Sequence, residues 1–233
     1  MDFNYYLDFM ISLAYVIHIV SLAIILLISI WLHEYAHAYV SYIQWDPTPK
    51  LQWRLTTNPL KHVDIIWFLM IFLIWFGWWK PVQINPYYYK NPIRWELFTA
   101  LAWPATNLCL SIIGIIIVLI IWKVSWLALT DIYLNNYGFL IWFFLQFSII
   151  NIALAVFNMI PLPPLDGFRL VKIISNNFAM KVENYSRYIA IWFVILIVFW
   201  ERLLWYDIIW NFISSVSSSI FNGLFTLFSS IFY

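Results

Sequence analysis

Residues 9–37 read FMISLAYVIHIVSLAIILLISIWLHEYAH, an apolar run that ends in a polar motif. From Phe9 to Leu32 the only ionisable side chain is His18. At 1.5 Å per residue, a helix of this length crosses the roughly 30 Å hydrocarbon core of a membrane. The whole chain agrees with this interpretation, because 64% of its 233 residues are apolar and 10% are charged, against about 25% charged in soluble domains. The sequence therefore predicts an integral membrane protein.

Charge and cysteine content exclude two classes of protein. The formal net charge is +1, so there is no electrostatic case for nucleic-acid binding. A single cysteine rules out a disulfide framework and a cysteine-based zinc site.

Further apolar runs predict the remaining membrane segments. Ile65–Trp79 is short for a crossing, because 15 residues of helix span only about 22 Å. We expect an all-α, polytopic membrane helical bundle with about five to six membrane segments, one of them a short re-entrant element. Residues 1–233 then form a single membrane-embedded domain with a core at about 9–170. The longer runs are Leu97–Trp122, Gly138–Ile160, Ile189–Trp200 with its continuation to Leu204, and the Ser-rich Ile208–Tyr233, which spans the membrane or lies at its interface.

The polar motif His33-Glu34-Tyr35-Ala36-His37 has the spacing of a metal site. Residues four apart share one face of a helix, so the imidazoles of His33 and His37 can hold one Zn²⁺ beside Glu34. Zinc lowers the pKa of a bound water towards 7, and the glutamate can take its proton. The alternative is a chance pattern at an amphipathic helix end, which is unlikely with only four histidines in the chain.

A catalytic zinc usually takes a third protein ligand. Asp46, Asp64, Glu96 and Asp166 are the candidates. Asp166 is the best placed, because it follows an apolar run in the segment NMIPLPPLDG (158–167), whose prolines forbid a regular helix. The alternative to a metal-binding role is that Pro and Gly in this segment only mark the end of a loop.

These motifs together resemble the site-2 protease family of intramembrane zinc metalloproteases, in its compact bacterial form. The resemblance covers about residues 29–170. It implies that His33, His37 and Asp166 bind one Zn²⁺ per chain and that Glu34 is the general base. The motifs that carry it, besides 33–37 and 158–167, are Asp46-Pro47-Thr48-Pro49-Lys50, Arg54-Leu55-Thr56, Asn58-Pro59-Leu60-Lys61-His62, Lys80-Pro81-Val82, Asn85-Pro86 and Pro104-Ala105-Thr106-Asn107.

Asn158 is implied by the same resemblance as a polar group near the scissile carbonyl, where a donor is needed as negative charge develops. The alternative for Asn158 is a hydrogen bond at a helix end. His62 and Asn107 also stand in family motifs, without a definite role. His62 is expected to be an ordinary loop histidine and His18 a satisfied or pore-lining polar residue.

The two halves of the proposed metal site must meet on one side of the membrane. They do so only if the segment after His62 enters and leaves on the same side, so we predict that Ile65–Val82 is re-entrant. The positive-inside rule agrees: this topology leaves Lys123 and Arg202 on one side and the other ten basic residues on the opposite, cytoplasmic side. A full crossing would divide the twelve seven to five. The zinc site then faces the cytoplasm.

Several tryptophans stand where the family pattern has glycine. The chain has 16 Trp and 5 Gly, whereas average usage would give about 16 Gly. Trp is the largest side chain, and the positive φ and the close backbone approach that Gly provides are both energetically costly for it. We hypothesise that UGA codons meant as glycine have been translated as Trp. The positions are Trp45, Trp53, Trp67, Trp95 and Trp103, with Trp79 as a further candidate.

The sequence thus predicts a zinc endopeptidase of the plasma membrane that cuts in or near transmembrane helices of membrane-protein substrates. Its expected partners are such substrates and the lipid bilayer, with an undetermined oligomeric state. The first alternative is a catalytically silent membrane scaffold that keeps the protease fold, which the intact Glu34 disfavours and the tryptophans at glycine positions favour. The second is a metal transporter, which would need ligating or charged residues along several spans, whereas the spans carry essentially only His18.

Overall fold

The computed structural model describes residues 3–62, 82–127, 137–193, 195 and 208–232. Four long helices account for most of them: α1 (Phe3–Ile43), α4 (Pro92–Leu127), α5 (Tyr137–Asn158) and α9 (Ile208–Phe232). The short elements are α2 (Thr48–Leu51), η1 (Pro59–Lys61), η2 (Pro86–Tyr88), α6 (Gly167–Ile174) and α7 (Asn176–Glu183).

Apolar helices dominate the structure, as the composition predicts. The described residues contain no strand, and four of the described helices are long and apolar enough to cross a membrane. The all-α membrane bundle is therefore confirmed, with four such helices among the described residues instead of the expected five to six. Of the other two expected segments, Ile65–Trp79 lies outside the described residues, and so does half of Ile189–Trp200. The four helices are Ser12–Ile43, Leu97–Val124, Tyr137–Asn158 and Ile209–Phe232.

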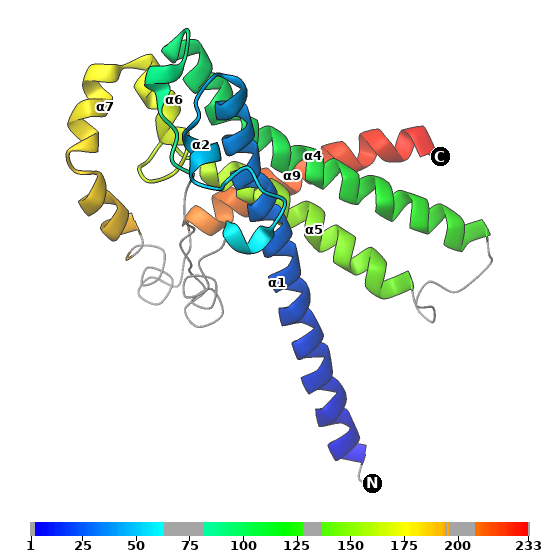
Figure 1. Cartoon of the computed structure of the whole chain (residues 1–233). Coiled ribbons are helices and arrows are strands. Elements are labelled where there is room, and N and C mark those ends of the chain that lie inside the picture. Colours follow the sequence, from blue (N-terminus) through cyan, green and yellow to red (C-terminus); the bar gives the residue numbers. More distant parts are fainter. Residues whose placement is uncertain (1–2, 63–81, 128–136, 194, 196–207, 233) are drawn as a thin grey trace.

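The bundle is built around the pair α4 and α5, which lie side by side with α1 and α9 packed against them (Figure 1). Small residues let this pair approach closely, as is usual between membrane helices. A Cβ on Gly114 of α4 would collide with Oγ of Ser148 on α5. That hydroxyl donates to the carbonyl oxygen of Ser111 at 3.0 Å, so the contact contains a hydrogen bond between the two helices.

The end of α1 and the start of α4 lie at the same end of the bundle. Oγ of Ser41 lies 2.8 Å from the Tyr89 hydroxyl, and Nε2 of Gln44 donates to Oγ1 of Thr99 at 3.3 Å. The chain therefore leaves α1 and enters α4 at one end, as a re-entrant Ile65–Val82 requires. Apart from Val82, that predicted element lies outside the described residues and stays a prediction.

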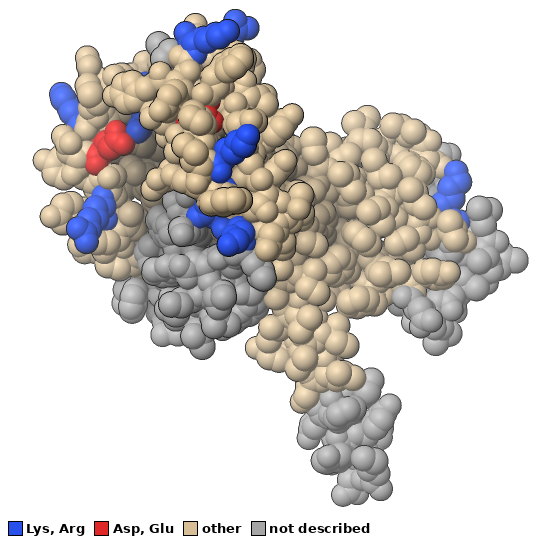
Figure 2. Space-filling model, in the orientation of Figure 1, with Lys and Arg blue, Asp and Glu red and all other residues tan. Residues whose placement is uncertain are grey.

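Basic side chains gather at this same end of the molecule. Figure 2 shows most of the Lys and Arg atoms over the region where α2, α6 and α7 lie. Lys123 lies at the opposite end of α4, where its Nζ donates to the carbonyl oxygen of Phe232 at 3.0 Å. The described basic residues thus have the asymmetry on which the topology prediction relies.

Two of the tryptophans that stand at expected glycine positions have a left-handed backbone. Trp45 has φ 75° and Trp53 has φ 57°, and they are the only non-glycine residues with positive φ among those described. Trp95 lies within the regular helix α4, where nothing in the backbone requires glycine. Trp103 is fully buried. Trp67 and Trp79 lie outside the described residues.

Candidate metal centre

His33 and His37 lie one turn apart on the last third of α1. The helix continues without interruption to Ile43, so the i and i+4 positions share one face. Their ring centroids are 5.2 Å apart, and both residues are buried. The two imidazoles therefore face one common point inside the protein, as the spacing of the motif predicts.

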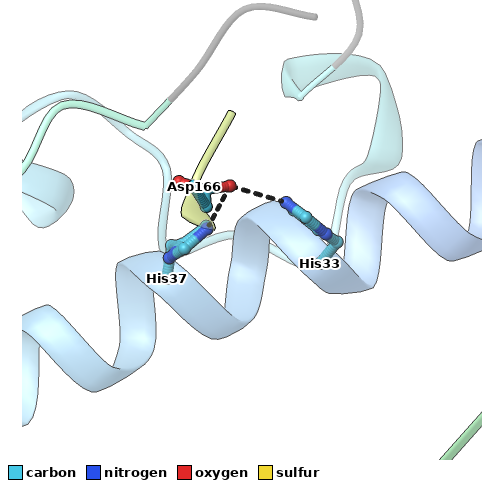
Figure 3. Close-up of side chains that lie close together, drawn as sticks. All are labelled: His33, His37 and Asp166. Carbon is cyan, nitrogen blue, oxygen red and sulfur yellow. Dashed lines mark hydrogen bonds and ion pairs between the residues drawn. The ribbon is translucent and has the colours of Figure 1, made fainter. Parts of the chain in front are cut away.

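Asp166 reaches this point because the chain turns sharply between α5 and α6. A Cβ on Gly167 would collide with the backbone of Met159 and Ile160, so glycine allows the start of α6 to pack directly on the end of α5. Asp166 stands at the N-cap position of α6, where an aspartate usually accepts from the helix N–H groups. Its side chain makes no such bond and points to the histidines instead (Figure 3).

The three donor atoms lie close enough together to share one metal ion. Oδ2 of Asp166 lies 3.3 Å from Nε2 of His37 and 3.7 Å from Nε2 of His33, and the ligand atoms all lie within 4.8 Å of one another. Tetrahedral zinc with bonds of about 2.0–2.2 Å places its ligand atoms about 3.3–3.6 Å apart. Two imidazole nitrogens and one carboxylate oxygen also match the ligand set of catalytic zinc sites. The residues present therefore fit the metal.

The Asp166 carboxyl is held in its ionised form. Burial alone would raise its pKa, but the charge of His37, its hydrogen-bond contact with Oδ2, and the nearby His33 imidazole hold that pKa well below its usual range. Nε of Arg169 adds a hydrogen bond to the other oxygen, Oδ1, at 3.2 Å. Because a metal ligand must be deprotonated, this environment leaves Oδ2 ready to bind.

Glu34 lies beside the three donors without being one of them. Its Oε1 is 3.9 Å from Nε2 of His33, and its Oε2 accepts a hydrogen bond from the Val82 backbone N–H at 2.9 Å. The carboxylate is buried and fixed through one oxygen. The other oxygen, Oε1, lies on the side of the His33 imidazole.

Of the other carboxylates considered as a third ligand, Asp46 can be placed in the structure, and it is not one of the clustered donors. Asp46 is fully buried, and its carboxylate accepts from Oγ of Ser41 and from the backbone N–H groups of Thr48 and Asn85. It therefore joins the end of α1 to the segments that follow. Asp64 and the side chain of Glu96 lie outside the described residues.

The remaining polar candidates are not among the three clustered donors. Nδ2 of Asn158 donates to the carbonyl oxygen of Leu154 at 3.2 Å, the helix-end bond that is the alternative to a catalytic role. Nε2 of His62 lies 3.3 Å from the carbonyl oxygen of Thr56, and burial lowers the His62 pKa. Asn107 is fully buried, and neither amide atom has a hydrogen-bond partner among the described residues. The His18 ring packs against Trp142.

Sequence reasoning missed three contributors to this environment. The Val82 N–H that holds Glu34 is a backbone group 48 residues away, and a backbone donor leaves no signature in the sequence. The indole of Trp103 packs 4.7 Å from the His33 ring and 6.4 Å from the His37 ring. Arg169 could have been found from its position three residues after Asp166, since that spacing brings side chains together on a helix.

The chain is similar to known proteins over the region that includes this centre. The model of peptidase family M50 matches residues 21–200, a stretch that includes the two histidines, Glu34 and Asp166. A protein of Bacillus subtilis (strain 168) described as "Putative zinc metalloprotease YwhC" is 33% identical over 214 residues, which cover 91% of this chain and 92% of that protein. No solved structure matches the chain.

Proposed function

The chain belongs to peptidase family M50, and we propose that it is an intramembrane zinc endopeptidase that hydrolyses peptide bonds in or near transmembrane helices. The observation that carries the proposal is the convergence of His33, His37 and Asp166. Two of the three belong to a helix, Ser12–Ile43, that is long and apolar enough to cross a membrane. A hydrolytic metal on such a helix is accessible to peptide bonds of membrane-embedded segments.

The chemistry follows from the donors and from the placement of Glu34. Zinc, when bound by His33, His37 and Asp166, supplies a Lewis acid that polarises the scissile carbonyl and lowers the pKa of water. The free oxygen of Glu34 takes the proton from the attacking water and later delivers it to the leaving amine. Because the Val82 N–H holds the other oxygen, this proton transfer needs no reorientation of the carboxylate.

Asn158 completes the proposed machinery as a donor to the oxyanion. Its side chain lies at the last residue of α5, just before the turn that carries Asp166. The amide has a single bond to Leu154 of its own helix, which it would exchange for one to the substrate oxygen as negative charge develops there.

The protein is proposed to lie in the plasma membrane, with its metal site facing the cytoplasm. Four apolar helices and the family make the chain a multi-pass membrane protein. The basic side chains gather at the end of the bundle where the metal ligands lie (Figure 2), and loops on the cytoplasmic side carry the excess of Lys and Arg. Transmembrane protein substrates and the bilayer are the proposed partners.

The experiment is cleavage of a model transmembrane substrate by the purified wild type and by Glu34→Gln, with the zinc content of both proteins measured. We expect cleavage by the wild type, none by Glu34→Gln, and about one zinc per chain in each. Cleavage that survives Glu34→Gln would refute the mechanism. A wild type that binds zinc and cleaves nothing would favour the silent scaffold.

A further inference from the structure

A polar cavity opens beside the metal centre, on the basic end of the molecule. Its volume is about 380 Å³, and it lies between the loop before Asp166, α6 and the helical residues 186–193. Asp166 forms part of its wall, so whatever occupies the cavity lies next to a proposed zinc ligand. The charged residues of its lining are Asp166, Arg169, Lys172, Glu183 and Arg187.

The charges of this lining do not cancel. Nε of Arg169 is bonded to Asp166 at 3.2 Å, and Nζ of Lys172 is bonded to Glu183 at 2.7 Å. Among the described residues, the guanidinium of Arg187 makes no hydrogen bond or ion pair. The cavity therefore has two neutralised pairs and one free cation, which can bind a carboxylate through two parallel hydrogen bonds.

We propose that this cavity is an acidic-residue subsite, in which Arg187 binds an Asp or Glu side chain of the substrate near the scissile bond. The inference rests on the proposed function, because it takes the neighbouring centre as the place of cleavage. Its chemistry is specific: a carboxylate complements the free cation, whereas a basic substrate residue would be repelled by the unpaired charge of Arg187. Arg187 is thus a specificity-determining residue.

The test measures binding to Glu34→Gln, which removes turnover. The probes are two fluorescent soluble peptides that differ only by Asp or Asn, and their anisotropy is followed at low ionic strength. We expect the Asp peptide to bind about threefold to fivefold more tightly, the effect of one partly exposed ion pair. Adding Arg187→Gln should abolish the difference, and Arg187→Glu should reverse it in favour of a Lys peptide.

Lys181→Gln is the matched control, because Lys181 is an exposed cation on α7 that does not line the cavity. It should leave the preference for Asp unchanged. Equal binding of both peptides, or an equal effect of Lys181→Gln and Arg187→Gln, would overturn the subsite. If the preference is present and the wild type cleaves nothing, only the proposed function fails.

A different observation, the backbone at two tryptophans, carries a second inference. For an L-residue the left-handed region is sterically unfavourable, and for a bulky residue it is a genuine outlier. Trp45 and Trp53 both lie there. Their side chains are 71% and 79% exposed, so little packing compensates for the strain. Both positions are among those where the family pattern expects glycine.

From this backbone we infer that residues 45 and 53 of the native protein are glycine, encoded by UGA. Trp103 extends the idea to the metal centre: its buried indole N–H has no hydrogen-bond partner among the described residues, and glycine there would open space against His33 and His37. The codons of the gene provide the test. TGA at 45 and 53, with glycine found there by peptide mass spectrometry of the protein from its own cells, is expected. TGG at either position would overturn the inference for that position.

Discussion

Glycine at position 53 should stabilise the protein relative to alanine, although both changes remove the same indole. With φ at 57°, alanine keeps a Cβ and therefore keeps the strain of about 1–2 kcal/mol. Glycine removes this strain and costs roughly 0.5–1 kcal/mol in backbone entropy. The expected difference is about 0.5–1 kcal/mol in favour of Trp53→Gly, which corresponds to about 1–4 °C in Tm for a chain of this size.

The same pair of changes at Trp192 is the matched control. That residue is 68% exposed and lies in the helical residues 186–193. In a helix interior glycine is about 0.8–1 kcal/mol less favourable than alanine, so the order of the two variants should reverse. Comparing glycine with alanine at each position cancels the contacts of the lost side chain.

The assay is reversible unfolding in mixed detergent micelles, with Trp53→Gly, Trp53→Ala, Trp192→Gly and Trp192→Ala measured together. A Trp53→Gly variant that is no more stable than Trp53→Ala would refute the argument from backbone strain. Trp45→Gly should stabilise the protein, relative to the unsubstituted chain, by less than Trp53→Gly does. The reason is that the substitution also removes an indole 5.4 Å from Nζ of Lys90, a contact worth about 0.5–1 kcal/mol at an exposed site.

Three further predictions concern the metal centre and its surroundings. Gly167→Ala should lower zinc content and activity together, because its Cβ would collide with the backbone of Met159 and displace Asp166; normal zinc content would contradict this reading. Asp46→Ala should destabilise the protein by about 2–4 kcal/mol in unfolding assays, since it leaves three donors unpaired, while any protein that folds keeps its zinc. Burial lowers the pKa of His62, so the unfolded state binds a proton on this residue more readily than the folded state does. Neutral His62 therefore contributes to the free energy of unfolding above about pH 6.5, and this contribution is lost as the pH falls. Tm against pH should be flatter for His62→Gln than for the wild type.

The local part of the metal centre could be predicted from the sequence. The four-residue spacing of His33 and His37 fixes their common face, because the geometry of a helix depends only on neighbouring residues. The contact of Asp166 with the two distant histidines could also be predicted from the sequence, since an acid after a long apolar run needs a partner. The sequence context of Trp45 and Trp53 also predicted positions that favour glycine, and the backbone has positive φ at both.

Contacts that depend on how distant segments return could not be predicted. The bond from Val82 N–H to Glu34 joins a backbone group to a side chain 48 residues away, and any residue type except proline could supply that donor. The packing of Trp103 on His33 depends on how α4 lies against α1. Nearly uniform apolar runs predict the lengths of the membrane helices, but they do not predict which helix faces pack against each other.

The most direct measurement of the central claim is the position of the cut. A substrate with one transmembrane helix is reconstituted with the protein in liposomes, and the products are sequenced by mass spectrometry. The proposed function predicts a cut within or next to the apolar segment that requires zinc and is absent with Glu34→Gln. A cut confined to the soluble tails, or one that persists with Glu34→Gln, would contradict it.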